Sequence, residues 1–436
     1  MSRAKLPASV EVTVAALDDD GLGQAIVGER PVVVKNALAG ERVTARVLRK
    51  RRGTLWAQAV EIADAAADRV APVCAVFPRC GGCAMQHLDY RKQLDLKEAR
   101  LLAALEGMGV VPERVAPKTT GPCYHYRSKA RLGVRLVGGE VLVGFRESFS
   151  SRVARMNACP TLVPALSTLL VPLRSLIASL SRPDRVPQVE LAAGDHAVAI
   201  VLRHLTPLTP ADQALIAGFG EDHGVRCYTQ EGGYETVAPA SRAAEEPYLG
   251  YGNPDFGLHF SFRPTDFTQV NMAMNRPLVR SAVDALAAPP GSNVLDLFCG
   301  IGNFSLALAA RGLLVYGLEG SAEAIERARL NARRNGLEGR CEFAVQDLYD
   351  AGSPGSRTAE YVLLDPPRSG AGPNLEAWLV AGDVLRVVYV SCSPASFAAD
   401  AARLAASGYT LERVGIFDMF PHTAHVETLG VFQKRW

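Results

Sequence analysis

The amino-acid sequence predicts an α/β protein whose C-terminal part is a doubly wound parallel sheet. Five apolar segments typical of buried strands recur between residues 294 and 392. Helix-like segments and short loops separate most of them, which is the pattern of a parallel sheet covered by helices. The first 67 residues instead contain short β-like runs separated by Gly, Asp and Asn turns. Two further, differently built regions are therefore expected before the sheet.

Composition and cysteine content narrow the class of protein. The chain has 436 residues, of which 48% are hydrophobic and 21% are charged, as is usual for a soluble enzyme. No apolar run approaches the ~18 residues of a membrane span, and the first residues lack the apolar core of a signal peptide. We expect a cytoplasmic monomer. In that compartment nine cysteines should be packing residues, ligands or nucleophiles rather than disulfides.

Residues 1–67 are predicted to form a small OB-like β-barrel, because five β-like runs fall within about 60 residues. The fourth run ends in a basic cluster, and Trp56 follows it closely. Basic clusters next to aromatic residues suit a phosphate backbone and stacked bases. One such cluster is equally typical of a solvated surface. The basic residues are Arg46, Arg49, Lys50, Arg51 and Arg52.

Residues 68–253 are predicted to form a central α+β region. It begins with the cysteine-rich segment "CAVFPRCGGC" and a helical pattern from Tyr90 to Met108, and strand patterns dominate from residue 127 to 236. Three cysteines have C-x5-C-x2-C spacing, and a fourth candidate ligand lies far downstream. By spacing alone they fit either a zinc site or an iron–sulfur cluster. These cysteines are Cys74, Cys80, Cys83 and Cys159.

Residues 254–436 are predicted to form a Rossmann-like domain with a cofactor site. Gly300 and Gly302 allow a tight turn after the first strand of "VLDLFCGIGNFSLALA". Glu319 ends the next strand, where an acid can bind ribose hydroxyls, and Asp347 ends the third, in position to meet an adenine edge. The turn lacks the third glycine of a dinucleotide site. Asp296 would repel a pyrophosphate, so S-adenosylmethionine is favoured over NAD.

The segment "YVSCSP" places Cys392 just past a strand and at the start of a helix. Helix N-terminal amides favour an anion and would lower the pKa of the thiol. The alternative is an inert packing cysteine. Asp365 and Arg368 project from the preceding strand end, in "LLDPPRSG".

A second candidate group lies near the C-terminus. Glu427 is surrounded by apolar residues, and desolvation of its carboxylate favours proton uptake. His422 and His425 precede it; they are either structural residues or part of a metal site.

A thiolate, a carboxylate and a methyl donor together predict methylation of uracil at C5. Uracil C5 is a poor nucleophile, but addition of a thiolate to C6 makes it enolate-like. C5 can then attack the sulfonium methyl group, and a base removes the C5 proton so that the thiol leaves. This is covalent catalysis, which divides one difficult step into easier ones.

These segments resemble the RNA uracil-5-methyltransferases that use S-adenosylmethionine. The motifs "DFTQVN", "LDLFCGIGNF", "LLDPPRSG", "YVSCSP" and "DMFPHTAHVET" occur in that family's order and spacing. The resemblance covers nearly the whole chain. The resemblance implies Cys392 as nucleophile and Glu427 as general base. It implies that Asp365 also contacts the uracil. The cofactor contacts that it implies are Gln269, Phe298, Asn303, Glu319, Asp347 and Asp365.

The resemblance also concerns the first two regions. It implies that the barrel is an RNA-binding TRAM domain and that a [4Fe-4S] cluster is bound by Cys74, Cys80, Cys83 and Cys159. With both features the chain is most similar to the 23S ribosomal RNA enzymes of the family. A tRNA target and a non-catalytic iron–sulfur RNA-binding protein remain alternatives.

Two other enzyme classes are disfavoured by single motifs. An RNA cytosine-5 methyltransferase would carry a second cysteine after the proline of the fourth-strand motif, and Pro366 is followed by Pro367 and Arg368. A methylthiotransferase would require C-x3-C-x2-C spacing.

Overall fold

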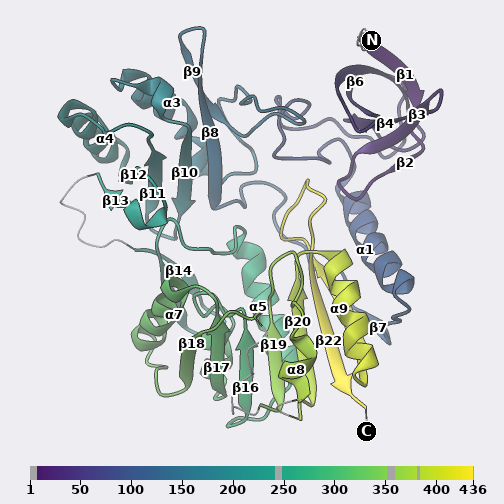
Figure 1. Cartoon of the computed structure of the whole chain (residues 1–436), viewed down its shortest axis with the longest axis vertical. Helices are drawn as coiled ribbons and strands as arrows, with labels where there is room; N and C mark the ends of the chain where they lie inside the picture. Colours follow the sequence, from purple (N-terminus) through teal and green to yellow (C-terminus); the bar gives the residue numbers. More distant parts are fainter. Residues whose placement is uncertain (1–6, 241–247, 351–358, 381–382, 436) are drawn as a thin grey trace.

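The computed structural model describes residues 7–240, 248–350, 359–380 and 383–435. Within these ranges the strands form a barrel-like sheet, a central sheet, a hairpin and an eight-stranded sheet (Figure 1). None of the described helices combines the length and the apolarity that crossing a membrane requires. The fold is mixed α/β, with the predicted parallel strands in its C-terminal part.

The N-terminal sheet contains six strands where five were predicted. The first predicted run is divided, because β1 pairs with β5 whereas β2 pairs with β3. One continuous run thus supplies both edge strands of the sheet, β1 and β2. Because these strands are only two residues apart in sequence, the two edges of the sheet lie close together. Alternate residues such as Val10 and Val12 are buried, as expected for strands with one face on a core. The strands are β1 (Ser9–Thr13), β2 (Ala16–Leu17), β3 (Gly23–Val27), β4 (Arg30–Lys35), β5 (Arg42–Arg51) and β6 (Thr54–Asp64).

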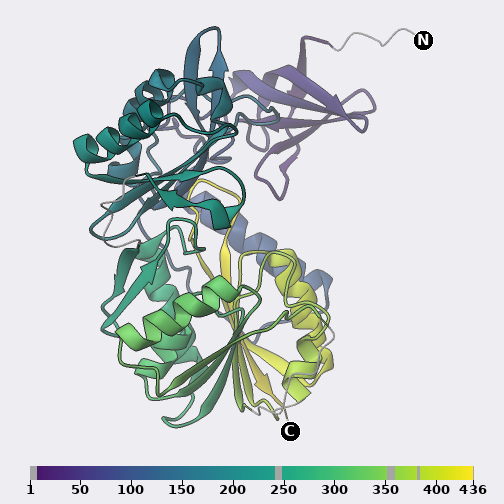
Figure 2. The same cartoon turned by 60° about the vertical axis from the view of Figure 1, so that its left-hand side comes forward.

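The central sheet lies beside the barrel (Figure 2) and has the order β13-β12-β11-β10-β8-β9. Helices pack against it and bury a leucine-rich core. Its strands are β8 (Lys129–Val137), β9 (Glu140–Gly144), β10 (Gln188–Ala193), β11 (Val198–Arg203), β12 (Val225–Gln230) and β13 (Ala238–Pro239). Its helices are α2 (Pro164–Ser167), α3 (Leu170–Ser179) and α4 (Pro210–His223), with 3₁₀ turns at Pro183–Arg185 and Tyr234–Thr236.

The eight-stranded sheet has the order β18-β17-β16-β19-β20-β22-β21-β7. The first five strands in this order are parallel, as predicted, but β22 is antiparallel to both of its neighbours. The reversal follows from the direct connection of β21 to β22 through residues 418–426. The strands are β7 (Arg114–Val115), β16 (Asn293–Leu297), β17 (Leu314–Glu319), β18 (Cys341–Val345), β19 (Tyr361–Leu364), β20 (Arg386–Ser391), β21 (Tyr409–Phe417) and β22 (Glu427–Lys434); the separate hairpin is β14 (Leu249–Asn253) with β15 (Leu258–Phe262).

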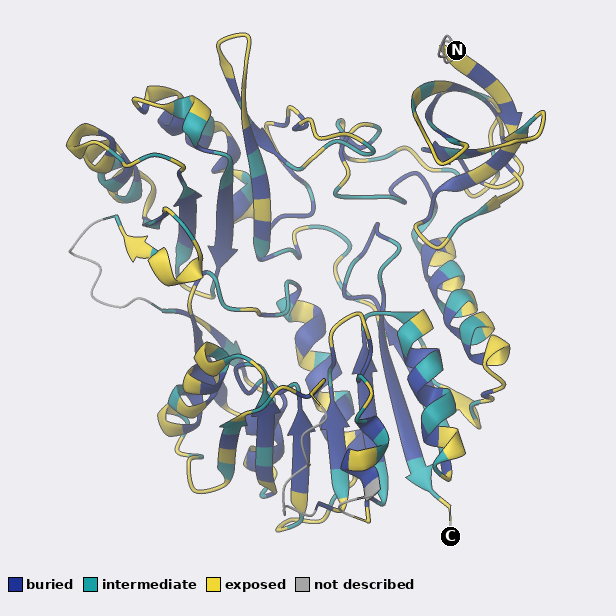
Figure 3. Ribbon diagram, in the orientation of Figure 1, coloured by how far each residue is buried: buried dark blue, intermediate teal, exposed yellow. Residues whose placement is uncertain are grey.

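Helices cover both faces of this sheet, and its middle strands β16, β19, β20 and β22 are mostly buried (Figure 3). The edge strands β7 and β18 are more exposed. One face packs against α5 (Met272–Leu286), α6 (Ser305–Ala310) and α7 (Ala322–Arg334). The other packs against α8 (Leu375–Val380), α9 (Pro394–Ala406) and α1 (Tyr90–Gly107). The helix predicted near residues 90–108 is therefore present. It lies within the range predicted as central, yet it packs along α9 of the C-terminal sheet.

Candidate active site

Local hydrogen bonds fix the turn that holds Cys392. This residue follows β20 directly, and Pro394 is the first residue of α9. Ser393 is the N-cap, and its hydroxyl accepts a hydrogen bond from Ser396 N at 3.4 Å. Ser391 Oγ accepts one from Ser393 N at 3.2 Å. Both serines thus stabilise the strand-to-helix turn, which leaves the Cys392 thiol half-buried at the carboxyl end of the parallel strands.

Glu427 lies beside Cys392 because β22 runs antiparallel to β20. The register pairs Ser391 with Thr428, so the next residues along the two strands are Cys392 and Glu427. A parallel β22 would have started at the opposite edge of the sheet. Glu427 is only 3% exposed, and its Oε2 atom has no hydrogen-bond partner among the described residues. A buried carboxylate oxygen without a partner is costly in a purely structural residue.

The electrostatics of this pair differ from the prediction made from the sequence. Burial, with the carboxylates of Glu427 and Asp365, raises the pKa of Cys392 to about 11. The helix N-terminus was expected to lower it, but Cys392 precedes the N-cap, and desolvation outweighs the dipole. Burial and the Asp365 charge also raise the pKa of Glu427 well above its usual range. The Arg368 guanidinium acts in the opposite direction on both groups.

Asp365 and Arg368 complete the charged surroundings of the thiol. Asp365 follows β19, and burial with the nearby Asp296 charge raises its pKa to about 7. Arg368 Nη2 lies 3.1 Å from His425 Nε2. Burial, more than the Arg368 charge, lowers the pKa of His425 to about 4. This imidazole is therefore neutral near pH 7 and can accept the Arg368 hydrogen bond.

The two histidines do not form a metal site in this structure. His425 contacts Arg368, whereas His422 contacts Gln93 on α1. Across the described ranges, no three His, Cys, Asp or Glu side chains are grouped to hold a single metal ion.

The glycine-containing turn after β16 is held by Glu319 from the end of β17. Glu319 Oε2 accepts a hydrogen bond from Gly300 N at 3.3 Å, and Oε1 accepts one from Ser321 N at 2.9 Å. Gly302 has a φ of 91°, and a Cβ there would lie 2.6 Å from a Leu306 methyl carbon. Phe298 also adopts a positive φ, of 63°. A residue with a Cβ at position 302 would therefore be strained, and glycine avoids this strain.

Internal hydrogen bonds hold Asp296 Oδ2 and the Asn303 side chain, whereas Asp296 Oδ1 has no hydrogen-bond partner among the described residues. Asp296 is fully buried, accepts a hydrogen bond from Ser305 Oγ, and has a pKa raised to about 7, mainly by burial. Asn303 exchanges two hydrogen bonds with Asn275, at 2.9 and 3.0 Å, and accepts a third from Tyr251. These hydrogen bonds stabilise the glycine-containing turn.

The remaining predicted cofactor residues lie around the same edge. Asp347 is exposed beyond β18, and its Oδ1 accepts a hydrogen bond from Tyr349 N at 2.9 Å. The Tyr349 ring meets Phe298 edge-on at 5.9 Å, and its hydroxyl donates to Gly370 O at 2.6 Å. Gln269 is half-buried on the segment that leads into α5. Sequence reasoning missed Tyr349; its only signal was an aromatic residue two positions after a strand-end acid.

The four cysteines predicted as ligands line one cavity with Phe77, Phe145 and Met156. Cys80 Sγ accepts a hydrogen bond from Gly82 N at 3.3 Å, and Cys83 Sγ accepts one from Gln86 Nε2 at 3.2 Å. Four soft sulfur donors around an apolar cavity, with N–H groups directed at sulfur, suit a cluster.

Comparison with known proteins agrees with this arrangement. Residues 8–60 match the model of the TRAM domain, residues 289–357 that of a methyltransferase domain, and residues 355–436 that of tRNA (Uracil-5-)-methyltransferase. The chain is 46% identical to the 23S rRNA (uracil(1939)-C(5))-methyltransferase RlmD of Alkalilimnicola ehrlichii, over 99% of this chain and 98% of the relative. The protein of the same name from Aromatoleum aromaticum is 44% identical, over 97% and 99%.

A solved structure has the same fold. The tRNA (uracil-54, C5)-methyltransferase of Pyrococcus abyssi, in complex with S-adenosyl-L-homocysteine, superposes with a TM-score of 0.75 at 23% identity, over 97% of this chain and all of the other. Fold and site together define a methyltransferase that uses S-adenosylmethionine and carries an N-terminal TRAM domain. The chain belongs to the family of 23S rRNA (uracil-C5)-methyltransferases.

Proposed function

We propose that this protein methylates C5 of one uridine in 23S rRNA, the position corresponding to uracil 1939 in its relatives' names. The single observation that supports the chemistry is the pairing of a thiol and a buried, unpartnered carboxylate on neighbouring antiparallel strands. The RNA target is supported by relatives at 44–46% identity along nearly the whole chain.

In the proposed reaction, Cys392 acts as a thiolate after its proton has passed to solvent. Its sulfur bonds to C6 of uracil, and the C5=C6 electron pair moves toward C5 and the O4 carbonyl. S-adenosylmethionine would supply an electrophilic methyl group; as C5 bonds to that carbon, the methyl–sulfur bond breaks and S-adenosylhomocysteine leaves. Glu427 then accepts the C5 proton, the C5=C6 double bond forms again, and the Cys392 thiolate leaves. One proton is released per methyl group transferred.

The charges around the site fit this sequence of steps. Arg368 favours the anionic forms of Cys392 and Glu427. Mutual repulsion between the thiolate and the Glu427 carboxylate ends once the sulfur is bonded to carbon, which favours ionisation of Glu427 when the base is needed. Asp365 lies within the same charged group and can accept a hydrogen bond from the uracil ring.

The cofactor contacts are proposed residue by residue. Phe298, Glu319 and Asp347 would bind the adenosine part at the ends of β16, β17 and β18. Gln269 and Asp365 would lie toward the methyl group. Because the Asn303 side chain is held by Asn275, its contact would be through the backbone amide.

The cysteine cavity is proposed to hold a [4Fe-4S] cluster on Cys74, Cys80, Cys83 and Cys159. The TRAM barrel, with its cluster of arginines, would bind the RNA backbone. The cluster has no electron to transfer in the balanced reaction, so its proposed role is structural. We also propose that the protein is cytoplasmic and acts as a monomer.

The test is methylation of defined RNA by the purified protein. A 23S rRNA fragment containing the proposed uridine should accept one methyl group at C5. The same fragment with that uridine changed to cytidine should accept none. A tRNA transcript serves as the competing substrate, and preferential methylation of tRNA would contradict the proposed target.

A further inference from the structure

The segment that ends at Glu427 is buried but has no regular structure. We call residues 418–426, which connect β21 to β22, the base loop. Most of its residues are buried, although none of them lies in a helix or strand. Buried backbone polar groups need partners. His422 adopts a φ of 64°, a sparsely populated region for a non-glycine residue, so surrounding contacts must hold this conformation. Within the loop, the Thr423 amide and hydroxyl both donate hydrogen bonds to Phe420 O.

Four consecutive carbonyl groups of the base loop each accept a hydrogen bond from a different segment. Met419 O accepts from Asn271 Nδ2 at 3.1 Å, and Phe420 O from Lys97 Nζ at 3.1 Å. Pro421 O accepts from Tyr126 Oη at 3.0 Å. His422 O accepts from the backbone amides of Ala84 and Met85, at 2.9 and 3.0 Å. All of these donors precede residue 272 in the sequence.

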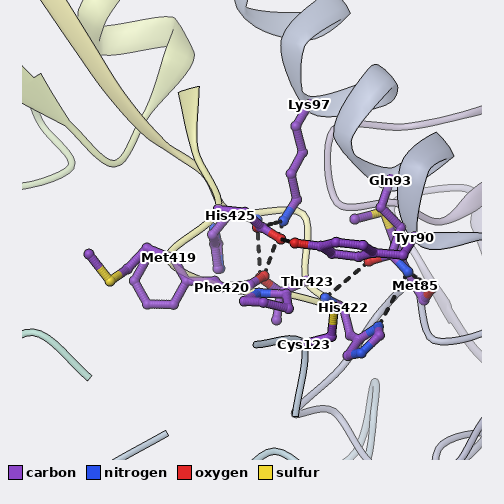
Figure 4. Close-up of polar contacts among 12 residues, drawn as sticks. Met85, Tyr90, Gln93, Lys97, Cys123, Met419, Phe420, His422, Thr423 and His425 are labelled. Carbon is purple, nitrogen blue, oxygen red and sulfur yellow. Dashed lines mark hydrogen bonds and ion pairs between the residues drawn. The ribbon is translucent and has the colours of Figure 1, made fainter. Parts of the chain in front are cut away.

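Side chains of α1 make the closest contacts (Figure 4). Lys97 Nζ lies 2.6 Å from Asp418 Oδ1, and both side chains are fully buried. Tyr90 Oη donates a hydrogen bond to Asp418 Oδ2 at 2.7 Å. Gln93 Oε1 accepts a hydrogen bond from His422 N at 3.0 Å. Three successive turns of one helix thus fix the beginning and the middle of the loop.

The segment next to the cysteine cavity belongs to the same network. Gln93 Nε2 donates to Met85 O at 2.9 Å and to Leu88 O at 2.8 Å, so Gln93 connects this segment to the base loop. Ala84 directly follows Cys83, and Gln86 donates to the Cys83 sulfur. The loop is therefore held by α1 and by the polypeptide that surrounds the proposed cluster.

We propose that Gln93 and Lys97 are positioning residues for Glu427, and that they control release of the methylated RNA more than methyl transfer. This inference rests on the proposed function. Cys392 is held by β20 and α9. Glu427 is the first residue of β22, where it pairs with Phe417, and it is joined directly to the base loop. Displacement of the loop should therefore move the base more than the nucleophile. The covalent protein–RNA adduct should form and persist.

The experiment is a single-turnover assay with the 23S rRNA fragment and labelled methyl donor. Methyl transfer is followed through the label in RNA, and release through loss of the protein–RNA adduct on a denaturing gel. For Gln93→Met we expect methyl transfer within about twofold of wild type and release slowed about 10- to 100-fold, since small displacements of a catalytic group cost that much. Lys97→Met combined with Asp418→Asn should behave in the same way.

Controls separate positioning from a general loss of structure. Lys92→Met makes the same substitution on the same helix, at a half-exposed residue, and should release RNA at the wild-type rate. Tyr126→Phe removes one hydrogen bond to the base loop and keeps the ring, so it should slow release slightly. If the other variants do not fold, this milder variant still tests the positioning role. Equal slowing of transfer and release, or release at the wild-type rate, would overturn the positioning role.

Glu427→Gln, assayed in parallel, distinguishes failure of the positioning role from failure of the base assignment. If it accumulates adduct while the Gln93 and Lys97 variants do not, only the positioning role is contradicted. If Glu427→Gln itself releases RNA normally, the base assignment in the proposed function is wrong.

Discussion

The nucleophile and the base of the proposed site lie side by side but are held in different ways. Cys392 is positioned by neighbours within a few residues: the end of β20, the hydroxyls of Ser391 and Ser393, and Pro394 at the start of α9. Glu427 follows an irregular loop whose carbonyls are bonded by residues about 150 to 340 positions away. One half of the site is encoded locally and the other half by tertiary structure.

This difference has a consequence for the reaction. In the proposed mechanism, formation of the adduct depends on the locally built turn, whereas its resolution depends on α1 and on the segment that surrounds the cysteines. Perturbations of the central region should therefore affect the second half of the reaction more than the first. The predictions below test this division, beginning with the largest expected effect.

Replacement of Cys392 by alanine should abolish methylation, because no bond to C6 can form. Binding of S-adenosylmethionine, measured by calorimetry, should remain within about twofold, since the thiol is no part of the proposed donor site and about 0.4 kcal/mol corresponds to that factor. Cys227→Ala, at a thiol on β12 of the central sheet, is the matched control and should retain activity. Substantial methylation by Cys392→Ala would contradict the covalent mechanism.

Lys97→Met should destabilise the protein strongly. It leaves the Asp418 carboxylate buried without its cation, a loss of about 3–5 kcal/mol in the free energy of unfolding. Lys92→Met, which removes a half-exposed ion pair at 4.0 Å, should cost no more than about 1 kcal/mol. Urea denaturation of the two variants measures the difference. Equal stabilities would show that α1 does not hold the base loop through this ion pair.

The pH dependence of kcat/KM should reflect the raised pKa values of the two proposed catalytic groups. The thiol of Cys392 has a pKa raised to about 11, and that of Glu427 is raised well above its usual range. Both groups must lose a proton to act, so kcat/KM should increase as pH rises above 7.

Arg368→Gln sharpens this measurement. Arg368 lowers the pKa of both groups, and its removal should move the profile to higher pH. A profile that is flat between pH 7 and 9 in the wild type would contradict the raised pKa of the nucleophile.

Ser393→Ala should have the smallest effect of the series. Loss of an N-cap hydroxyl costs about 1 kcal/mol of stability, and the strand, Pro394 and the helix remain to hold Cys392. The melting temperature should fall slightly and adduct formation should slow modestly, with release unchanged. Slowed release with normal formation would reverse the proposed assignment of the two halves.

The sequence predicted most of what is determined locally. The parallel strands β16 to β20, the glycine turn, the acids at strand ends and the start of α9 follow from hydrophobic periodicity and helix signals. The antiparallel β22 could not be predicted in this way, because strand direction depends on which neighbour it pairs with. The contacts of Lys97 and Gln93 with the base loop lie more than 300 residues apart in sequence.

The pKa of Cys392 also could not be predicted from the sequence. A helix N-terminus can be located from sequence, so a lowered thiol pKa was expected for Cys392. Burial and the approach of Glu427 and Asp365 from two other strands raise it instead. These terms depend on tertiary structure and dominate at such a site.

Peptide mass spectrometry of the Glu427→Gln protein after reaction with S-adenosylmethionine and the 23S rRNA fragment tests the central claim most directly. The account predicts that, after nuclease and protease digestion, the peptide containing Cys392 carries a methylated uridine nucleotide. Unmodified Cys392 in every peptide, with methylated RNA released normally, would contradict it.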